Sequence, residues 1–320
     1  MEGVTPLSFG GAPIGNLYRE TGDADARAAI DAAWRSGVRY FDTAPHYGLG
    51  LSERRLGEAL SERPRDEYVI STKVGRLLVP GDDGPGLSEG YAVRAGLRRR
   101  WDFSRDGVLR SLEGSLERLG LDRVDVLYLH DPDDHWEQAA GQAYPALAEL
   151  RDQGVVRAIG AGMNQSEMLA RFVRETDIDL IMLAGRYTLL EQGALDELLP
   201  LCVERGVGVI AVGVFNSGLL SRAWPERGAK YDYADAPVDL VERARALAAV
   251  CERHGVALPA AALQFPFAHP AVVSVGVGCR TAAQLERNVE LFGAPVPGAL
   301  WGELVAEGLL RADAPVPAVR

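Results

Sequence analysis

Cysteine is scarce in this sequence, and its arrangement excludes two classes of protein. The 320 residues contain three cysteines, Cys202, Cys251 and Cys279, which are widely spaced and form no CxxC pair. Disulfide-stapled secreted domains and zinc modules both need more cysteines at closer spacing. We therefore predict a cytoplasmic protein without a disulfide framework.

Basic residues are outnumbered by acidic ones. Lys and Arg together number 34 against 45 Asp and Glu, the formal net charge is −11, and the densest basic run is Arg98-Arg99-Arg100. Because nucleic-acid binding depends on a concentrated basic face, we expect no nucleic-acid partner.

The sequence also lacks the usual signs of a targeting signal or a membrane span. Residues 1–10 contain Glu2 and Pro6 where a signal peptide would have an apolar core. The uncharged stretch 256–279 is long enough to cross a bilayer, but three prolines interrupt it. We interpret it as a buried helix, a break and a strand, and expect no membrane association.

Short β-rich runs alternate with helical patterns along the whole chain. Strands are predicted at 7–10, 39–42, 68–72, 124–129, 156–160, 179–183, 208–212 and 272–275. Helices are predicted at 23–36, from 104 onward, and at 138–154, 165–176, 193–206, 238–254 and 281–291. Strands that are followed by helices indicate a parallel sheet. Eight such units without a linker favour a closed (β/α)8 TIM barrel over an open doubly wound sheet.

One segment interrupts this alternation. Residues 74–103, after the third strand, are rich in glycine and show no helical pattern. Loops of this length are uncommon and are often active-site lids, and in a barrel this one would lie at the rim where active sites are built. We predict a long lid loop within a single domain, residues 1–320, whose tail at 312–320 is loose.

Polar side chains follow three adjacent predicted strands where each strand ends. Asp42 and Tyr47 follow the second strand, Lys73 the third and His130 the fourth. Each of them alone has a structural explanation, such as a turn cap or a solvated lysine. Because the carboxyl ends of parallel strands meet at one rim of a barrel, we expect the four side chains to lie together.

These four residue types suit proton transfer at a carbinol or carbonyl oxygen. A free tyrosine has a pKa of about 10, too high for efficient proton exchange at neutral pH, and an ammonium such as that of Lys73 would lower the pKa of Tyr47. Asp42 would hold the ammonium, and His130 would hydrogen-bond the substrate oxygen. Because the set offers neither a nucleophile nor a redox centre, a nicotinamide cofactor is implied as the hydride carrier.

The same residues carry a resemblance to a known family. The run FDTAPHYG (41–48), followed by Ser-Glu and Gly within 52–57, resembles the aldo-keto reductase signature. The strand ends STK (71–73) and LH (129–130) and the run 206–220 continue the match over nearly the whole chain.

Four further runs point to a subfamily. HDPDDH (130–135), GAGMN (160–164), GRY (185–187) and FNSG (215–218) look most like the D-threo-aldose 1-dehydrogenases, of the L-fucose or L-galactose dehydrogenase type, with pyridoxal 4-dehydrogenases close by. The resemblance implies oxidation of the anomeric hydroxyl of an aldose to the lactone. The alternatives are a pyridoxal 4-dehydrogenase, a general aldehyde reductase, or a cofactor-binding sensor without turnover.

The resemblance further implies a barrel that binds NAD(P) along its C-terminal rim without a Rossmann domain. The tetrad Asp42, Tyr47, Lys73 and His130 matches the family's catalytic residues. Cofactor contacts are implied for Asn164, Phe215, Asn216, Ser217, Gly218, Leu219, Gly278, Arg280, Gln284 and Asn288.

Three departures from the family pattern bear on the choice of cofactor. Ala184 and Val212 stand where many relatives have a Gln and a stacking Tyr, and Gln284 replaces an Arg that contacts the adenosine phosphate in NADP-selective members. Losing that Arg removes a bidentate phosphate partner. We expect NAD, with NADP accepted if Arg280 supplies the phosphate contact.

Substrate contacts are expected from Asp131, His135 and Trp224, and the expected ligand is a small sugar or aldehyde. The acidic and histidine-rich run 130–135 also resembles a metal site, but metal-dependent barrel hydrolases collect ligands from several strands. We therefore expect no metal, and a monomer or small homo-oligomer.

Overall fold

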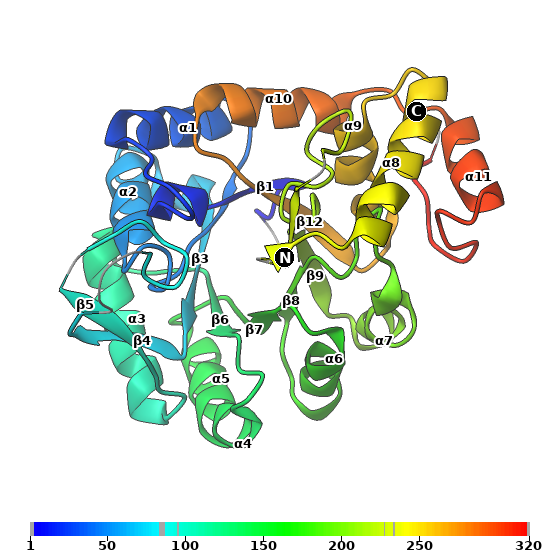
Figure 1. Cartoon of the computed structure of the whole chain (residues 1–320). Coiled ribbons are helices and arrows are strands. Elements are labelled where there is room, and N and C mark those ends of the chain that lie inside the picture. Colours follow the sequence, from blue (N-terminus) through cyan, green and yellow to red (C-terminus); the bar gives the residue numbers. More distant parts are fainter. Residues whose placement is uncertain (1–2, 83–86, 95, 227, 233, 319–320) are drawn as a thin grey trace.

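Eight parallel strands close into a barrel with helices around it (Figure 1). The computed structural model describes residues 3–82, 87–94, 96–226, 228–232 and 234–318. The strand order around the barrel is β1-β12-β9-β8-β7-β6-β3-β2. The strands are β1 Leu7–Gly10, β2 Tyr40–Asp42, β3 Val69–Val74, β6 Val126–His130, β7 Ala158–Met163, β8 Leu180–Ala184, β9 Gly208–Val212 and β12 Val272–Gly278. The predicted TIM barrel is confirmed, and each strand overlaps its predicted range.

The predicted helices are present, and two more accompany them. The helices of eight residues or more are α1 Asp23–Arg35, α2 Leu51–Leu60, α3 Arg105–Leu119, α5 Tyr144–Asp152, α6 Ser166–Glu175, α7 Leu198–Arg205, α8 Val238–Arg253, α10 Ala282–Gly293 and α11 Gly298–Ala306. The predicted helix at 138–154 is shorter, because a π-helical turn, Ala139–Ala143, precedes α5. The sequence prediction missed α2 and α11.

Glycine explains why α2 was missed. Gly57 in the middle of this helix lowers its intrinsic helix propensity, so the pattern is weak. A Cβ at that position would lie 1.9 Å from the Leu119 carbonyl oxygen. The glycine therefore allows α2 to pack directly on the end of α3, and tertiary packing outweighs propensity.

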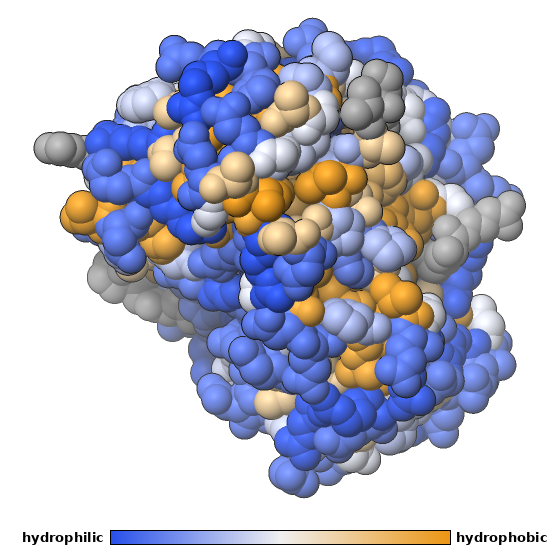
Figure 2. Space-filling view, turned by 90° about the vertical axis from the view of Figure 1, so that its right-hand side faces the viewer, coloured by the Kyte–Doolittle hydropathy of each residue, from blue (hydrophilic) through white to orange (hydrophobic). Residues whose placement is uncertain are grey.

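The hydrophobic core has two parts, separated by the barrel wall. The larger part fills the space between strands and helices. The smaller part fills the barrel interior and consists of Tyr40, Val69, Val126, Tyr128, Ala158, Leu180, Met182 and Ile210. On the face in Figure 2 hydrophilic residues cover most of the surface, with apolar residues gathered mainly across its middle.

The segment after β3 is more ordered than predicted. Its ends form an antiparallel hairpin of β4, Arg76–Pro80, and β5, Leu97–Trp101. Between them, Tyr91 makes a β-bridge with Leu17. Residues 83–86 and 95 of the predicted lid lie outside the described residues. The hairpin strands are regular structure where the sequence predicted a loop. The function of this segment as a lid stays a prediction.

The uncharged stretch 256–279 folds as predicted. It forms α9, Leu258–Gln264, a short turn at Pro266–Ala268 and then β12. Among the described residues no single helix is long and apolar enough to cross a membrane; α8 and the segment Leu258–Ala268 pass that test only as a pair bent by 101°. In the C-terminal segment Ala314 is buried against the core, so the predicted loose tail is packed at that residue.

A buried ion pair joins α2, α3 and β3 near the C-terminal end of β3. Glu53 of α2 is fully buried, and it accepts hydrogen bonds from Arg118 Nε of α3 at 2.6 Å and from Thr72 Oγ1 of β3 at 2.8 Å. Removing one partner of a buried pair leaves an uncompensated charge. The pair therefore makes the packing of these three elements depend on Arg118.

We expect Arg118→Met to destabilise the fold by about 3–5 kcal/mol, because Glu53 would stay buried without its cation. Urea unfolding followed by circular dichroism measures the loss. Arg105→Met on the same helix is the matched control, because its partner Glu149 and Arg105 itself are both half-exposed, and it should cost less than about 1 kcal/mol. Equal losses in the two variants would contradict a special role for the Glu53 pair.

Candidate active site

The ends of β2 and β3 bring the predicted carboxylate and ammonium into direct contact. Lys73 Nζ lies 2.7 and 2.6 Å from the two carboxylate oxygens of Asp42 and donates a third hydrogen bond to the Thr43 carbonyl at 2.9 Å. Lys73 is 2% exposed and Asp42 6% exposed. Burial raises the pKa of the Asp42 carboxyl, and the Lys73 ammonium opposes that shift.

Tyr47 lies in the turn after β2, next to this ion pair. Lys73 Nζ is 4.7 Å from the centre of the Tyr47 ring. The turn lies very close to the N-terminal segment. A Cβ at position 48 would lie 2.1 Å from the Gly15 carbonyl oxygen, so only glycine fits there. Gly48 also has φ +67°, a conformation that favours glycine. The glycine after Tyr47 thus allows the turn to pack against the N-terminal segment with the phenol beside Lys73.

Two neutral histidines border the Tyr47 ring. The His130 ring centre lies 5.8 Å from that of Tyr47 and 5.3 Å from that of His46. Burial, reinforced by the nearby Arg76, lowers the pKa of His46 to about 2 and that of His130 well below its ordinary value. His130 Nδ1 is buried without a hydrogen-bond partner among the described residues. A neutral imidazole can donate one hydrogen bond to a substrate oxygen without bringing a positive charge.

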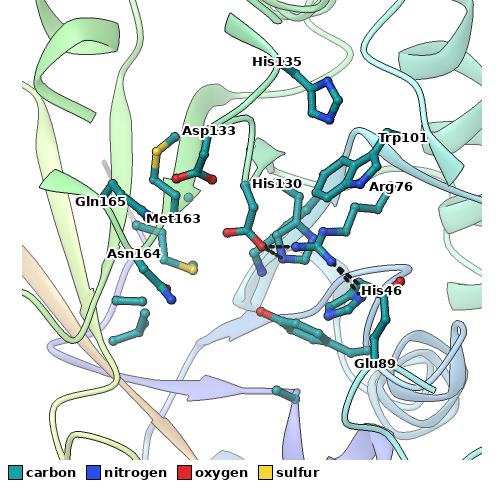
Figure 3. Close-up of a pocket in the computed structure, with 18 of the residues that line it drawn as sticks. His46, Arg76, Glu89, Trp101, His130, Asp133, His135, Met163, Asn164 and Gln165 are labelled. Carbon is teal, nitrogen blue, oxygen red and sulfur yellow. Dashed lines mark hydrogen bonds and ion pairs between the residues drawn. The ribbon is translucent and has the colours of Figure 1, made fainter. Parts of the chain in front are cut away.

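A cavity of about 580 Å³ opens above Tyr47, Lys73 and His130. Figure 3 shows His46, Arg76, Glu89 and Trp101 on one side and Asp133, Met163, Asn164 and Gln165 on the other. The structure therefore brings together the whole predicted tetrad, and it also places the predicted substrate residues Asp131 and His135 on the cavity wall.

The wall includes residues that the sequence interpretation missed. Arg76 of the hairpin donates hydrogen bonds to Asp131 Oδ2 at 2.5 Å and to Glu89 Oε2 at 3.0 Å. Its guanidinium also lies 4.3 Å from the centre of the Trp101 ring. The only sequence signal for Arg76 was its place just after the third strand's end. Its partner Asp131 has φ +45°, which places it in a strained turn after β6.

This network accounts for the acidic run that resembled a metal site. Asp131 accepts a hydrogen bond from Arg76, and the His135 ring lies tilted against that of Trp101 with ring centres 5.0 Å apart. Among the described residues no group of three or more His, Cys, Asp or Glu side chains is placed to hold a metal ion.

A second cavity of about 720 Å³ runs along the rim from Tyr47 to α10. It shares Asn164, Ala184 and Val212 with the first cavity, so the two form one cleft. Its wall includes most residues predicted to contact the cofactor: Asn164, Phe215, Asn216, Ser217, Gly218, Gly278, Arg280, Gln284 and Asn288.

The groove wall fits an elongated polar ligand. The consecutive residues Asn216, Ser217 and Gly218 have φ values of 45°, 57° and 97°, so the backbone folds back sharply beside the groove. Asn216 Oδ1 is buried without a hydrogen-bond partner in the described part of the chain. Such an orphaned acceptor requires explanation, and a donor on a bound ligand would satisfy it. The groove therefore suits the dinucleotide expected from the sequence.

Two predicted contacts lie away from the cleft. Leu219 is 1% exposed and packs in the core, and Trp224 is 48% exposed on the surface; neither lines either cavity. A residue's place in a loop does not determine which way its side chain points, so the contacts of these two residues with a ligand stay predictions that the cavity walls do not support.

Arg280 has a different environment from the one expected of a phosphate ligand. Its Nη1 donates to the carbonyls of Pro13 at 3.1 Å and Arg19 at 3.3 Å and to Thr21 Oγ1 at 3.0 Å. Its Nη2 donates to the Leu17 carbonyl. Both terminal nitrogens are therefore engaged in holding the segment between β1 and α1.

The sequence profile of the aldo/keto reductase family matches residues 6–304. The chain belongs to the aldo/keto reductase family. It is 50% identical over 312 residues to D-threo-aldose 1-dehydrogenase from a Pseudomonas species, covering 96% of this chain and 95% of that protein. It is 41% identical over 327 residues to pyridoxal 4-dehydrogenase from Microbacterium luteolum, with coverage of 96% and 95%.

The fold agrees with this assignment. A solved aldo-keto reductase from Bacillus halodurans, in its holo form, superimposes with a TM-score of 0.76 at 27% identity and covers 99% of this chain and 94% of that one. The chain is therefore an oxidoreductase, and the family predicted from the residues is confirmed. Aldo-keto reductases use NAD(P)H and act on small aldehydes or sugars.

The contacts of Arg280 lead to a testable outcome. We expect Arg280→Ala to raise the Michaelis constants for NAD and NADP by similar factors, roughly tenfold each, because hydrogen bonds from a charged donor are lost from the groove wall. Steady-state kinetics with both cofactors measure this. Arg35→Ala is the control, since Arg35 is an exposed arginine that pairs with Glu286 of α10 and lines neither cavity, and it should leave both Michaelis constants unchanged. If Arg280→Ala raised the Michaelis constant for NADP alone, Arg280 would instead be a ligand of the adenosine phosphate.

Proposed function

We propose that this enzyme is an NAD(P)-dependent aldose 1-dehydrogenase that oxidises the anomeric hydroxyl of a sugar to a lactone. The observation that carries the proposal is the charged wall that faces Tyr47, formed by Arg76, Glu89 and Asp131. Sugar hydroxyls are both donors and acceptors, and carboxylates and guanidinium groups match them. The 50% identity to a D-threo-aldose 1-dehydrogenase supports the same substrate class.

Tyr47 takes the proton of the anomeric hydroxyl in this proposal. The Lys73 ammonium beside its ring favours the phenolate, because opposite charges attract strongly in a buried site. Asp42 keeps that ammonium charged and fixed through two hydrogen bonds. Reversing the proton transfer lets the same three residues protonate the oxygen of a carbonyl that is being reduced.

His130 positions the oxygen that loses the proton. Its ring lies edge-on to Tyr47, at an interplanar angle of 89°. Because its pKa is lowered by burial, it stays neutral at the pH of the reaction. It therefore donates a hydrogen bond that orients the substrate and leaves the proton transfer to Tyr47.

The rim groove would hold the dinucleotide through Asn164, the turn 215–218 and residues of the β12–α10 region. A nicotinamide held there would supply the acceptor for the hydride that leaves the sugar carbon. We propose NAD as the preferred cofactor. Gln284 accepts a hydrogen bond from the Arg280 backbone, Arg280 is engaged by carbonyls, and neither side chain offers a free cation to an adenosine phosphate.

A pyridoxal or general aldehyde oxidoreductase is the competing proposal, supported by the 41% identical relative. An aromatic substrate would favour a flatter and more apolar pocket than one lined by Arg76, Glu89 and Asp131. A sensor without turnover is disfavoured by the complete tetrad.

A substrate panel with NAD tests the proposal. We expect turnover of L-fucose-type aldoses to exceed that of pyridoxal and of simple aliphatic aldehydes in the wild type, measured as reduced-nicotinamide absorbance. In Arg76→Met the Michaelis constant for the aldose should rise about 10-fold or more, because charge-assisted hydrogen bonds are lost, with little change for a simple aldehyde.

Arg100→Met is the matched control for Arg76→Met. Arg100 lies on the same hairpin, pairs with Asp102 and does not line either cavity. Its kinetics should equal those of the wild type. Pyridoxal turnover without aldose turnover would establish the competing function.

Tyr47→Phe tests the proton transfer. We expect oxidation to fall by about 10²–10⁴-fold, the range for losing a general acid–base group, while the dissociation constant for NAD, followed by fluorescence titration, changes less than about twofold. A variant with most of its activity retained would remove Tyr47 from the mechanism.

A further inference from the structure

A chain of buried hydroxyl groups connects the interior of the barrel to Asp42. Ser71 Oγ lies 2.7 Å from Asp42 Oδ1. The Tyr40 hydroxyl lies 3.0 Å from Ser71 Oγ, and the Tyr128 hydroxyl lies 3.1 Å from that of Tyr40. Ser71, Tyr40 and Tyr128 are all fully buried. Asp42 is thus contacted by Lys73 from the rim and by this chain from below.

The direction of every hydrogen bond in the chain follows from Asp42. Its carboxylate is ionised beside the Lys73 ammonium and can only accept, so Ser71 donates its single proton to Asp42. The oxygen of Ser71 then accepts from Tyr40, which leaves Tyr40 to accept from Tyr128. All three O–H groups therefore point toward Asp42.

Packing alone does not require these hydroxyls. Tyr40 and Tyr128 lie among the apolar side chains of the barrel interior, including Val69, Val126 and Leu180. Phenylalanine would fill nearly the same volume, and burying a hydroxyl is unfavourable unless it is hydrogen-bonded. The hydroxyls are explained by the carboxylate at the end of the chain.

Aligned donors in a buried site polarise one another and stabilise the negative charge at the end of the chain. The donors thereby weaken the electrostatic potential that the Asp42 carboxylate exerts on neighbouring groups. The positive charge of Lys73 acts more strongly on Tyr47 as a result, since Lys73 Nζ lies 4.7 Å from the centre of that ring and Asp42 is in contact with the same ammonium. Removing a donor from the chain would therefore disfavour the Tyr47 phenolate.

We propose that Ser71, Tyr40 and Tyr128 are positioning residues, which hold Asp42 and Lys73 and so set the pH at which Tyr47 exchanges its proton. The proposal rests on the proposed role of Tyr47. Other titratable groups that face Tyr47 are His46, His130 and Tyr91, which belong to its own turn, to β6 and to the segment inside the hairpin. Arg76 and Arg99 add positive charge around the two histidines.

Ultraviolet titration of the phenolate band tests the proposal without requiring turnover. The protein contains 10 tyrosines, so the titration of Tyr47 is obtained as the difference between a protein and its Tyr47→Phe counterpart. Ser71→Ala should move this titration upward by roughly 0.5 pH unit or more, since it removes a donor to a charged group. Tyr40→Phe should move it in the same direction by a smaller amount.

Ser274→Ala is the matched control. Ser274 is another fully buried barrel serine. It donates to Ser8 Oγ at 2.9 Å, and among the described residues no hydrogen bond joins it to Asp42. It should leave the titration unchanged. The acid limb of the pH profile of kcat/KM for oxidation should move with the titration in each variant.

The outcomes are separable. If Ser71→Ala does not fold, as judged by its thermal unfolding, Tyr40→Phe carries the test. An unchanged Tyr47 titration in the folded variants, or an equal shift in Ser274→Ala, would overturn the proposal. A shifted titration in an enzyme that oxidises no sugar would uphold the hydroxyl chain and reject only the aldose dehydrogenase assignment.

Discussion

The whole site depends on keeping one ammonium charged where almost no water reaches it. Lys73 is 2% exposed, and an isolated charge so deeply buried would be neutralised. Asp42 compensates it at 2.6–2.7 Å, and the Thr43 carbonyl accepts its third hydrogen bond. The barrel rim makes this possible, because adjacent parallel strands deliver the carboxylate and the ammonium to the same point. Tyr47 then needs only to lie above the pair.

The rest of the cleft divides into two chemically distinct parts around that point. On the side of the hairpin, Arg76 joins Glu89 and Asp131 in a charged wall, while the histidines beneath it remain neutral because they are buried. On the side of α10, the groove is elongated and contains an unsatisfied amide oxygen at Asn216. One part suits a polyhydroxylated molecule and the other a dinucleotide.

The sequence predicted the barrel and the tetrad because both follow from local rules. Strand ends in a parallel barrel share a rim, so Asp42, Lys73 and His130 could be placed without coordinates. Arg76 was missed because its role depends on how a hairpin folds back over the rim. The surface position of Trp224 and the turn of the Arg280 guanidinium toward the segment between β1 and α1 could not be read from the sequence for the same reason: both side-chain directions are set by contacts distant in sequence. Tyr40 and Tyr128 are 88 residues apart in the sequence, so nothing local indicates that their hydroxyls meet inside the barrel.

The hydrogen bonds of Arg280 to the segment between β1 and α1 connect the two parts of the cleft. Arg280 bonds the Leu17 carbonyl, and Leu17 forms a β-bridge with Tyr91, a residue of the substrate cavity wall. Only two contacts separate the adenosine end of the groove from the aromatic wall beside Tyr47. Leu17 also lines both cavities, so any displacement of the segment between β1 and α1 changes the wall of each cavity at once.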